Sequence, residues 1–249
     1  MTLITSIHNQ RIKQWHKLKQ RKHREREQKF LIEGHHLVEE AYQSNWPIET
    51  IIVTENVDIS NHLSSLEIVT VSESVLHHLS QTQTPQGIIA VVKKKHIPFT
   101  ASGHVLLLDA IQDPGNLGTM IRTADAAGFS AVFLGRGTVD LYNDKVIRAT
   151  QGSMFHLPII QELLEHVIED LKDKSYTIVA TDLSSKTIDY TSVKNITKGA
   201  LILGNEGAGI TETFLEKADL SVKIPIHGQA ESLNVSVAAG ILMYHLRQS

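Results

Sequence analysis

The sequence predicts an α/β protein whose second half is a mostly parallel sheet with helices on both faces. Three observations support this fold class. From residue 105 onward, short apolar segments alternate with segments of helical periodicity. The segment 105–109 is apolar along nearly its whole length, which is typical of a strand buried on both faces. Glycine, proline and asparagine separate these segments, as expected of strand–helix–strand units.

The elements of the second half follow from that alternation. We expect strands at residues 105–109, 131–134, 177–181, 200–203 and 222–226, and helices at 117–127, 160–171 and 233–247. Gly128 follows the first of these helices and is well placed to end it in the left-handed conformation. In a parallel sheet, ligands bind in loops at the carboxyl ends of strands, so a site is expected in those loops.

The first half predicts a smaller α/β domain. We expect helices at residues 9–28, 36–43 and 74–80, and strands at 29–32, 51–53, 68–71 and 88–92. The polar stretch that follows contains Pro98 and Gly103 and is typical of a linker. We therefore predict one domain at residues 1–97 and a second at 104–249, joined by residues 98–103.

Composition places the chain among ordinary globular proteins. Of its 249 residues, 41% are hydrophobic and 20% are charged. The absence of cysteine excludes disulfides, a thiolate nucleophile and zinc sites with cysteine ligands. The 14 histidines show no metal-ligand spacing, so no metal site is predicted. No apolar run is long enough to span a bilayer and the N-terminus lacks a signal core, so we expect a cytoplasmic protein.

Basic residues are concentrated near the N-terminus. Between residues 11 and 29 the sequence has nine lysines and arginines and two glutamates, an excess of seven positive charges. Such a segment can bind the phosphates of a polyanion. A solvated helix face would have the same composition, so charge alone leaves both interpretations open.

The first of three polar loops, residues 109–116, follows the strand at 105–109. Pro114 and Gly115 fit a tight turn, and Asn116 can cap the helix that follows. Arg122 lies further along that helix among apolar residues, where its guanidinium could bind a phosphate. A surface pair with Asp125 is the simpler interpretation of Arg122 taken alone.

The second loop, residues 204–209, follows the strand at 200–203. Gly204, Gly207 and Gly209 allow its backbone to wrap closely around a ligand. Their spacing differs from the dinucleotide-binding pattern, and no phosphate-binding lysine follows. Asn205 and Glu206 lie inside the loop although a plain turn does not require them, and Glu206 could accept a hydrogen bond from a ribose hydroxyl.

The third loop, residues 224–236, leads into the last helix. Ser232 is a plausible N-cap, and the free N–H groups of a helix start favour an anion or a polar ligand. For Ser232 taken alone, simple capping is the better explanation. Asn234 and Ser236 follow in a helix that is otherwise apolar nearly all round and is therefore expected to be buried. Buried polar side chains need partners, which predicts a site or an interface here.

Taken together, the three loops resemble the motifs of the SpoU/TrmH branch of the SPOUT RNA methyltransferases. The matching segments are Asn116-x-Gly118-x-x-x-Arg122, Leu203-Gly-Asn-Glu-Gly-x-Gly209, and Ile224-Pro-Ile followed by Ser232-Leu-Asn-Val-Ser236. Their order and spacing also match. The resemblance covers residues 104–249, and residues 1–97 resemble the substrate-binding domain often fused in front of that domain.

This resemblance implies a catalytic domain with a C-terminal trefoil knot, an exception to the usual unknotted topology. It implies S-adenosyl-L-methionine bound against Gly204, Ile224 and Leu233, and a homodimer with active sites near the interface. It also implies that Arg122 is essential and that the remaining active-site positions are Asn116, Glu206, Ser232 and Asn234.

The activity implied is methylation of a ribose 2′-hydroxyl in RNA. By analogy, the two-domain layout favours ribosomal RNA over transfer RNA as the substrate. Arg122 would bind a phosphate and stabilise the developing alkoxide, because free arginine titrates at a pH too high for an ordinary base. The N-terminal segment would add phosphate contacts. The residues expected to make them are Arg11, Lys13, Arg21, Lys22, Arg24 and Arg26.

Two other classes of protein remain open from the residues alone. One is an RNA-binding protein that keeps the scaffold of a methyltransferase without its activity. The other is a doubly wound nucleotide enzyme, although both of its usual phosphate-binding patterns are missing from this sequence.

Overall fold

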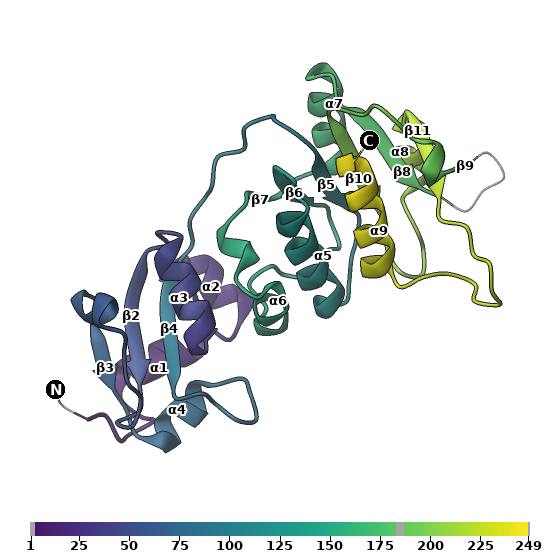
Figure 1. The fold of residues 1–249 in the computed structure, drawn as a ribbon. Coiled ribbons are helices and arrows are strands. Elements are labelled where there is room, and N and C mark those ends of the chain that lie inside the picture. Colours follow the sequence, from purple (N-terminus) through teal and green to yellow (C-terminus); the bar gives the residue numbers. More distant parts are fainter. Residues whose placement is uncertain (1–2, 183–186, 249) are drawn as a thin grey trace. The chain divides into compact units, whose positions relative to one another are not determined.

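The computed structural model describes residues 3–182 and 187–248. Contacts divide the chain into two compact units (Figure 1). Unit 1 consists of Met1–His96 and Asp140–Phe155, and unit 2 of Ile97–Val139 and His156–Ser249. The segment Asp140–Phe155 therefore packs with the first unit, whereas a single division at 98–103 assigns it to the second domain.

The sheet of unit 1 has the strand order β1-β4-β2-β3. Its strands are β1 (Lys29–Glu33), β2 (Ile48–Val53), β3 (Ile68–Thr70) and β4 (Ile88–Lys93). Strand β4 is antiparallel to both β1 and β2, and β2 is parallel to β3. All four strands were predicted from the sequence, with boundaries shifted by up to three residues.

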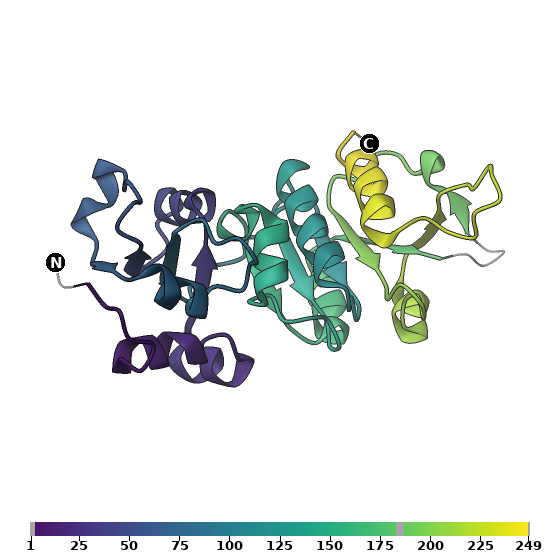
Figure 2. The ribbon, with the colours of Figure 1, turned by 90° about the horizontal axis from the view of Figure 1, so that it is seen from below.

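Helices cover both faces of this sheet. On one face, α1 (Gln10–Lys17) and α4 (Glu73–Leu79) pack against β2, β3 and β4 through a shared apolar core. Helix α3 (His35–Gln43) contacts β1 and β4. Figure 2 shows α1 and α2 (Arg21–Glu27), both purple, following one another along one side of the sheet. A short 3-10 helix, η1 (Asn61–Ser65), precedes β3.

The predicted basic helix at residues 9–28 is wrong as a single element. It is two helices, α1 and α2 (Arg21–Glu27), joined by an elbow at residues 18–20. The Arg24 guanidinium donates hydrogen bonds to the backbone carbonyls of Leu18 and Lys19, at 2.9 and 2.7 Å. These carbonyls lie where α1 ends, so the arginine of the second helix supplies donors that the backbone lacks at the break.

The segment Asp140–Phe155 completes the core of unit 1. It contains α6 (Asp144–Thr150) and the 3-10 helix η2 (Ser153–Phe155), neither of which was predicted. Asp140 forms a buried ion pair with Arg24. The Trp46 indole N–H donates to the Phe155 carbonyl at 3.1 Å.

Tyr142 of the same segment packs its ring 4.7 Å from that of Phe30, and the Lys94 ammonium lies 4.3 Å from the Tyr142 ring centre. Burial raises the pKa of Tyr142 to about 12. The ring is therefore neutral at physiological pH and acts as part of the apolar core of unit 1.

Unit 2 is built on one parallel sheet with the strand order β7-β6-β5-β10-β8-β11-β9. Every strand pair described in this sheet is parallel, which confirms the predicted sheet type. The strands are β5 (Val105–Leu108), β6 (Ala131–Leu134), β7 (Ile159–Gln161), β8 (Thr177–Thr181), β9 (Ile188–Asp189), β10 (Gly199–Leu203) and β11 (Leu220–Lys223).

Helices lie on both faces of the parallel sheet, as predicted. Helices α7 (Leu164–Asp173) and α8 (Glu212–Lys217) share one apolar core with side chains of β5, β6, β8 and β10. Helices α5 (Pro114–Ala126) and α9 (Val235–Gln248) contact β6 and β10, respectively, and lie side by side (Figure 1). A 3-10 helix, η3 (Tyr190–Ser192), contacts α9.

Two expectations about elements of unit 2 are corrected. The helix predicted at 160–171 begins only at Leu164, because residues 159–161 pair with β6 as the edge strand β7. A short apolar run does not by itself distinguish a strand from a helix. The last helix is not buried all round, since Val237 and Tyr244 are 52% and 47% exposed. No helix in the described parts of the chain is both long and apolar enough to cross a membrane.

We predict that unit 2 loses stability in mild acid through His104. This buried side chain accepts a hydrogen bond from the Gly199 N–H at 2.9 Å, which requires an unprotonated Nδ1. Burial lowers the pKa of His104 below its ordinary value of 6.5, and the nearby Arg247 adds to the shift. Protons then bind the unfolded state more tightly, so this stability is complete above pH 6.5 and is lost as the pH falls below it.

Hydrogen exchange of the β10 amides at pH 7.5 and 5.5 would measure this effect, with protection factors corrected for intrinsic exchange. The variant His104→Asn keeps an acceptor that does not titrate and serves as the control. We expect protection to fall at the lower pH in the wild type and to change less in the variant. Equal losses in both proteins would contradict the assignment.

Candidate functional site

Three polar loops leave the carboxyl ends of strands in unit 2, where ligands of parallel sheets bind. The loops after β5 and β10 are neighbours because these two strands pair directly. The third loop follows β11, which is separated from β10 only by β8. The order of the strands therefore brings segments about a hundred residues apart to one edge of the sheet.

Asn205 holds the loop after β10 against the loop after β5. Its side-chain amide donates to the Ala110 carbonyl at 2.9 Å, and its side-chain oxygen accepts from the N–H groups of Gly207 and Ala208. The backbones of Asn205 and Gly209 also exchange two hydrogen bonds. One side chain thus shapes the glycine loop and attaches it to the neighbouring loop.

Two residues of the first loop, Asp109 and Ala110, bond to the segment that follows β10. Ala110 has a positive φ of 54°, an uncommon conformation for a residue with a side chain. Asp109, which is buried, accepts a hydrogen bond from the Thr211 N–H at 2.8 Å. Asp109 and Ala110 were not predicted from the sequence as site residues, and Asn205 was noted only as a residue that a plain turn does not require. An asparagine inside a glycine-rich turn was the available signal, because such side chains often bond their own loop.

A chain of hydrogen bonds joins the three loops. Asn116 donates through its side-chain amide to a Glu206 carboxylate oxygen at 3.0 Å. It accepts through its side-chain oxygen from the Asn234 amide, also at 3.0 Å. Three of the five predicted active-site residues are therefore in direct contact, one from each loop.

Helix capping in these loops differs from the prediction. Asp113, not Asn116, caps α5 by accepting from the Asn116 N–H at 2.7 Å. Asn234, not Ser232, caps α9, because its side-chain oxygen accepts from the N–H groups of Ser236 and Val237. Because Asp113 caps α5, the side chain of Asn116 is available to the other two loops.

Gly204 is required by close packing of the glycine loop on itself. A Cβ at this position would lie 2.3 Å from the carbonyl carbon and oxygen of Gly209 and 2.4 Å from the Ile210 nitrogen. A Cβ added at Gly207, in the same loop, would lie 3.6 Å from its nearest neighbour, the side-chain oxygen of Asn205. The glycines of this loop therefore have different functions, and Gly204 is the one that any side chain would disrupt.

Arg122 lies on the exposed side of α5. Six residues of helix separate it from Asn116, which is about 9 Å along the axis. No hydrogen bond or ion pair of Arg122 is found within residues 3–182 and 187–248, and the alternative partner Asp125 instead contacts His156. The guanidinium is thus available to an external anion rather than joined to the Asn116 chain.

The third loop, which supplies Asn234 to this polar chain, also presents apolar side chains. Ile226 and Leu233 are among the exposed large hydrophobic residues of the protein, and Ile224 is half-buried. Exposed apolar side chains in such a loop are available to pack against an apolar group of a ligand. Ser232 is also exposed in this loop.

The basic residues of unit 1 fall into two groups. Lys13, Arg21 and Lys22 are exposed on α1 and α2. Arg11 is half-buried and pairs with Glu67, and Arg26, which is exposed, pairs with its neighbour Glu27. The exposed cations therefore give α1 and α2 a positively charged surface.

Arg24 is the exception, since only 7% of its side chain is exposed and all its described partners lie within unit 1. Its guanidinium is occupied inside the protein, so we leave it out of the RNA-binding surface.

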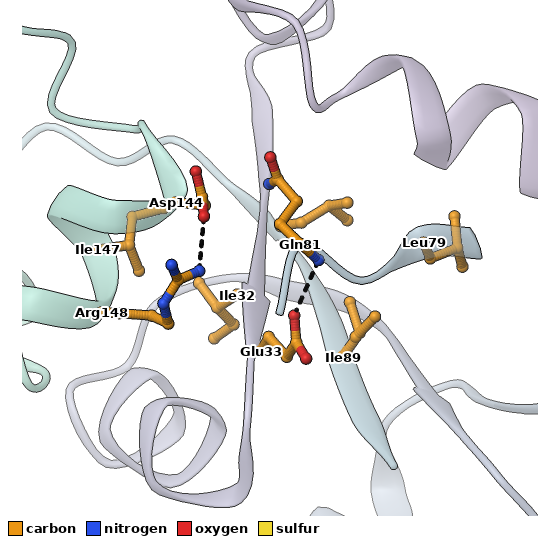
Figure 3. Close-up of a pocket in the computed structure, with 9 residues that line it drawn as sticks. Ile32, Glu33, Leu79, Gln81, Ile89, Asp144, Ile147 and Arg148 are labelled. Carbon is orange, nitrogen blue, oxygen red and sulfur yellow. Dashed lines mark hydrogen bonds and ion pairs between the residues drawn. The ribbon is translucent and has the colours of Figure 1, made fainter. Parts of the chain in front are cut away.

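A hollow in unit 1, shown in Figure 3, lies between β1, the segment after α4, and α6. Its carboxylate, Glu33, already accepts hydrogen bonds from the hydroxyls of Ser80 and Thr82 and from the Gln81 N–H. Its cation, Arg148, is paired with Asp144. The charged groups of this hollow thus already have partners within unit 1, so we assign it a structural role.

Three linked polar loops lie at the carboxyl edge of a parallel sheet, which is where α/β proteins of this kind bind small molecules. Family comparison makes the class specific. Residues 103–244 match the model of the SpoU rRNA methylase family, and residues 9–90 match an MRM3-like substrate-binding domain. The chain belongs to the SpoU rRNA methylase family.

Individual relatives agree with this assignment. The chain is 45% identical to the 23S rRNA (guanosine(2553)-2′-O)-methyltransferase RlmP of Bacillus subtilis (strain 168), over 99% of this chain and all of the relative. It also resembles the crystal structure of an AdoMet-bound rRNA methyltransferase from Sinorhizobium meliloti, with 30% identity and a TM-score of 0.89, over 99% of this chain and 97% of that one.

A third similar structure is the SpoU methyltransferase AviRb from Streptomyces viridochromogenes in complex with AdoMet. It is 27% identical, with a TM-score of 0.86 over 96% of this chain and 97% of that chain. The expected trefoil knot stays a prediction.

We predict that Gly204→Ala disrupts the glycine loop. The added methyl group overlaps backbone atoms that cannot rotate away, and overpacking of this kind costs about 1–3 kcal/mol. Thermal unfolding should show a lower Tm, and hydrogen exchange in residues 204–210 should be faster.

The matched control is Gly207→Ala, which has room for its methyl group and keeps the N–H that Asn205 accepts from. It should resemble the wild type in both measurements. Similar effects from the two substitutions would show that close packing at Gly204 is not the cause.

Proposed function

We propose that this chain transfers a methyl group from S-adenosyl-L-methionine to a ribose 2′-hydroxyl of ribosomal RNA. The observation that carries the proposal is the hydrogen-bond chain from Glu206 through Asn116 to Asn234. It joins the three loops whose motifs define the family, in a chain that matches the family model along residues 103–244.

The residues at the carboxyl edge fit this cofactor. Apolar side chains of Ile224 and Leu233 can pack against the adenine ring, and the loop that begins at Gly204 offers backbone groups to its polar edge. Two of the similar structures are described as bound to AdoMet. When bound, the cofactor supplies an electrophilic methyl group on a positively charged sulfur.

The side chains then have separate tasks. Asn234 and Ser232 orient the ribose, and Glu206, held in place by Asn116, accepts a hydrogen bond from the nucleoside. Arg122 binds an RNA phosphate through its fork of N–H donors and stabilises negative charge on the attacking oxygen. A free, exposed guanidinium suits this task, because an arginine paired inside the protein could not turn toward RNA.

The substrate is ribosomal RNA, and the first domain binds it. The 45% identical relative is named for a guanosine of 23S rRNA, and both this chain and that relative are matched over almost their whole lengths. We assign RNA binding to residues 1–97 and catalysis to residues 104–249. Arg11, Lys13, Arg21, Lys22 and Arg26 supply phosphate contacts on α1 and α2. We assign the protein to the cytoplasm because its proposed substrate is ribosomal RNA.

The catalytic domain forms a homodimer through α9. Val237, Ile241 and Tyr244 are spaced by four and three residues and so form one stripe along this helix. Val237 and Tyr244 are about half exposed, which leaves an apolar surface in water. Helix α5 packs beside α9, and a Cβ added at Gly240 would lie 3.7 Å from the Thr123 side chain. The helix that carries Arg122 therefore lies next to the stripe.

Loss of Arg122 should abolish methylation and leave cofactor binding intact. Cells that lack this protein would be complemented with the wild type, with Arg122→Ala, or with the surface control Lys172→Ala. The 2′-O-methyl sites of their ribosomal RNA would then be mapped. We expect one site restored by the wild type and the control, and a loss of at least about 100-fold in rate for Arg122→Ala, the size of effect seen for charge-stabilising groups.

Calorimetry with S-adenosyl-L-methionine completes this test, since Arg122→Ala should bind as the wild type does. A protein that binds RNA but neither binds the cofactor nor restores a methyl group would be a non-catalytic binder on this scaffold. A site restored in transfer RNA instead would overturn the choice of substrate.

For the dimer, Val237→Glu should shift the protein to a monomer in sedimentation experiments, because it places a charge inside the apolar stripe. The conservative change Val237→Ile should leave the dimer intact. A wild-type protein that sediments as a monomer at micromolar concentrations would contradict the dimer.

A further inference from the structure

The elbow between α1 and α2 contains a pocket that the proposed chemistry does not use. It is a cavity of about 230 Å³ in unit 1. This volume approaches the lower end of the range of small-ligand pockets. Its lining residues come from α1, α2, β1 and β2, and they are Gln14, Trp15, Lys17, Leu18, His23, Arg26, Glu27, Lys29 and Glu49.

The shape of the pocket is fixed by Arg24, which does not line it. Its guanidinium bonds the carbonyls of Leu18 and Lys19 at the elbow and pairs with Asp140. The indole of Trp15 and the side chain of Leu18 are buried and form an apolar part of the wall. The cavity is therefore held open by internal bonds, and a ligand would find it already formed.

The polar groups of the pocket include both donors and acceptors. Lys17, Arg26 and Lys29 are cations, and Glu27 and Glu49 are carboxylates. Arg26 pairs with Glu27 and Lys29 with Glu49, but both pairs are partly exposed, so a ligand can replace them at little cost in free energy. A phosphate alone would be repelled by the two carboxylates. A nucleotide combines an anionic phosphate, which cations bind, with a base whose exocyclic amino group donates to a carboxylate.

We propose that the elbow pocket holds one unpaired nucleotide of the RNA substrate, with a base that carries an exocyclic amino group. Proteins recognise RNA sequence mainly in such unpaired nucleotides, whose base edges are exposed. Glu27 and Glu49 accept from the amino group, and Lys17 and Arg26 bind the phosphate. This inference rests on the proposed function, because it takes RNA as the substrate of the protein.

The test compares two single-stranded probes of equal length, oligo(C) and oligo(U), by fluorescence anisotropy with the full-length protein at one salt concentration. Cytosine carries the amino group and uracil does not. We expect the wild type to bind oligo(C) about tenfold more tightly, within the discrimination of one good base contact. The ratio of the two affinities is the readout, because a change in net charge affects both probes alike.

Glu27→Gln and Glu49→Gln should each reduce that ratio toward one. The matched control is Glu25→Gln, which removes an exposed glutamate of the same helix outside the pocket and should leave the ratio unchanged. Lys17→Ala should lower the affinity for both probes by the same factor. Circular dichroism of each variant verifies that it is folded.

Two results would overturn the proposal that the pocket binds such a nucleotide. One is an affinity ratio of one in the wild type, and the other is a ratio that neither Glu27→Gln nor Glu49→Gln changes. Methylation of ribosomal RNA by a wild type that shows no preference would reject the pocket and leave the proposed function standing. A preference for oligo(C) in a protein that restores no methyl group would support the pocket and reject the proposed function.

Discussion

The side chain of Asn116 connects the parts of the site that the chain places far apart. Its amide group donates to Glu206 and accepts from Asn234, so one planar group aligns residues 90 and 118 positions away. This is possible because Asp113 caps α5 and leaves the Asn116 side chain unused by its own helix. Asn205 then fixes the glycine loop to Ala110 at the same edge. The proposed chemistry depends on these few bonds, since catalysis of methyl transfer is mainly alignment.

Much of this arrangement could be predicted from the sequence because it follows from local patterns. Alternating apolar segments predicted the parallel sheet, and parallel strands place their following loops at one edge. The three polar loops were therefore expected to meet, and Asn116, Glu206 and Asn234 do. Their detailed tasks were less accessible. Ser232 was predicted to cap α9, but Asn234 caps it in the structure. Either residue type can cap a helix, and only the backbone geometry selects one of them.

What could not be predicted depends on contacts between distant segments. The break between α1 and α2 is stabilised by Arg24, whose other partner, Asp140, lies 116 residues away. The helical composition of residues 9–28 contains no sign of that partner. For the same reason the packing of Asp140–Phe155 with unit 1 was missed. The exposed stripe on α9 was taken for a buried face, since an apolar helix can be covered by its own chain or by a second one.

A double-mutant cycle between Asn116 and Asn234 tests the central claim most directly. The value of kcat/KM for RNA methylation would be measured for the wild type, Asn116→Ala, Asn234→Ala and the double variant. The cycle removes the separate cost of losing the α9 cap. If the loops act as one site, the two substitutions should be coupled by about 1 kcal/mol or more. Strictly additive effects would mean that the two side chains work independently and that their hydrogen bond does not organise the site.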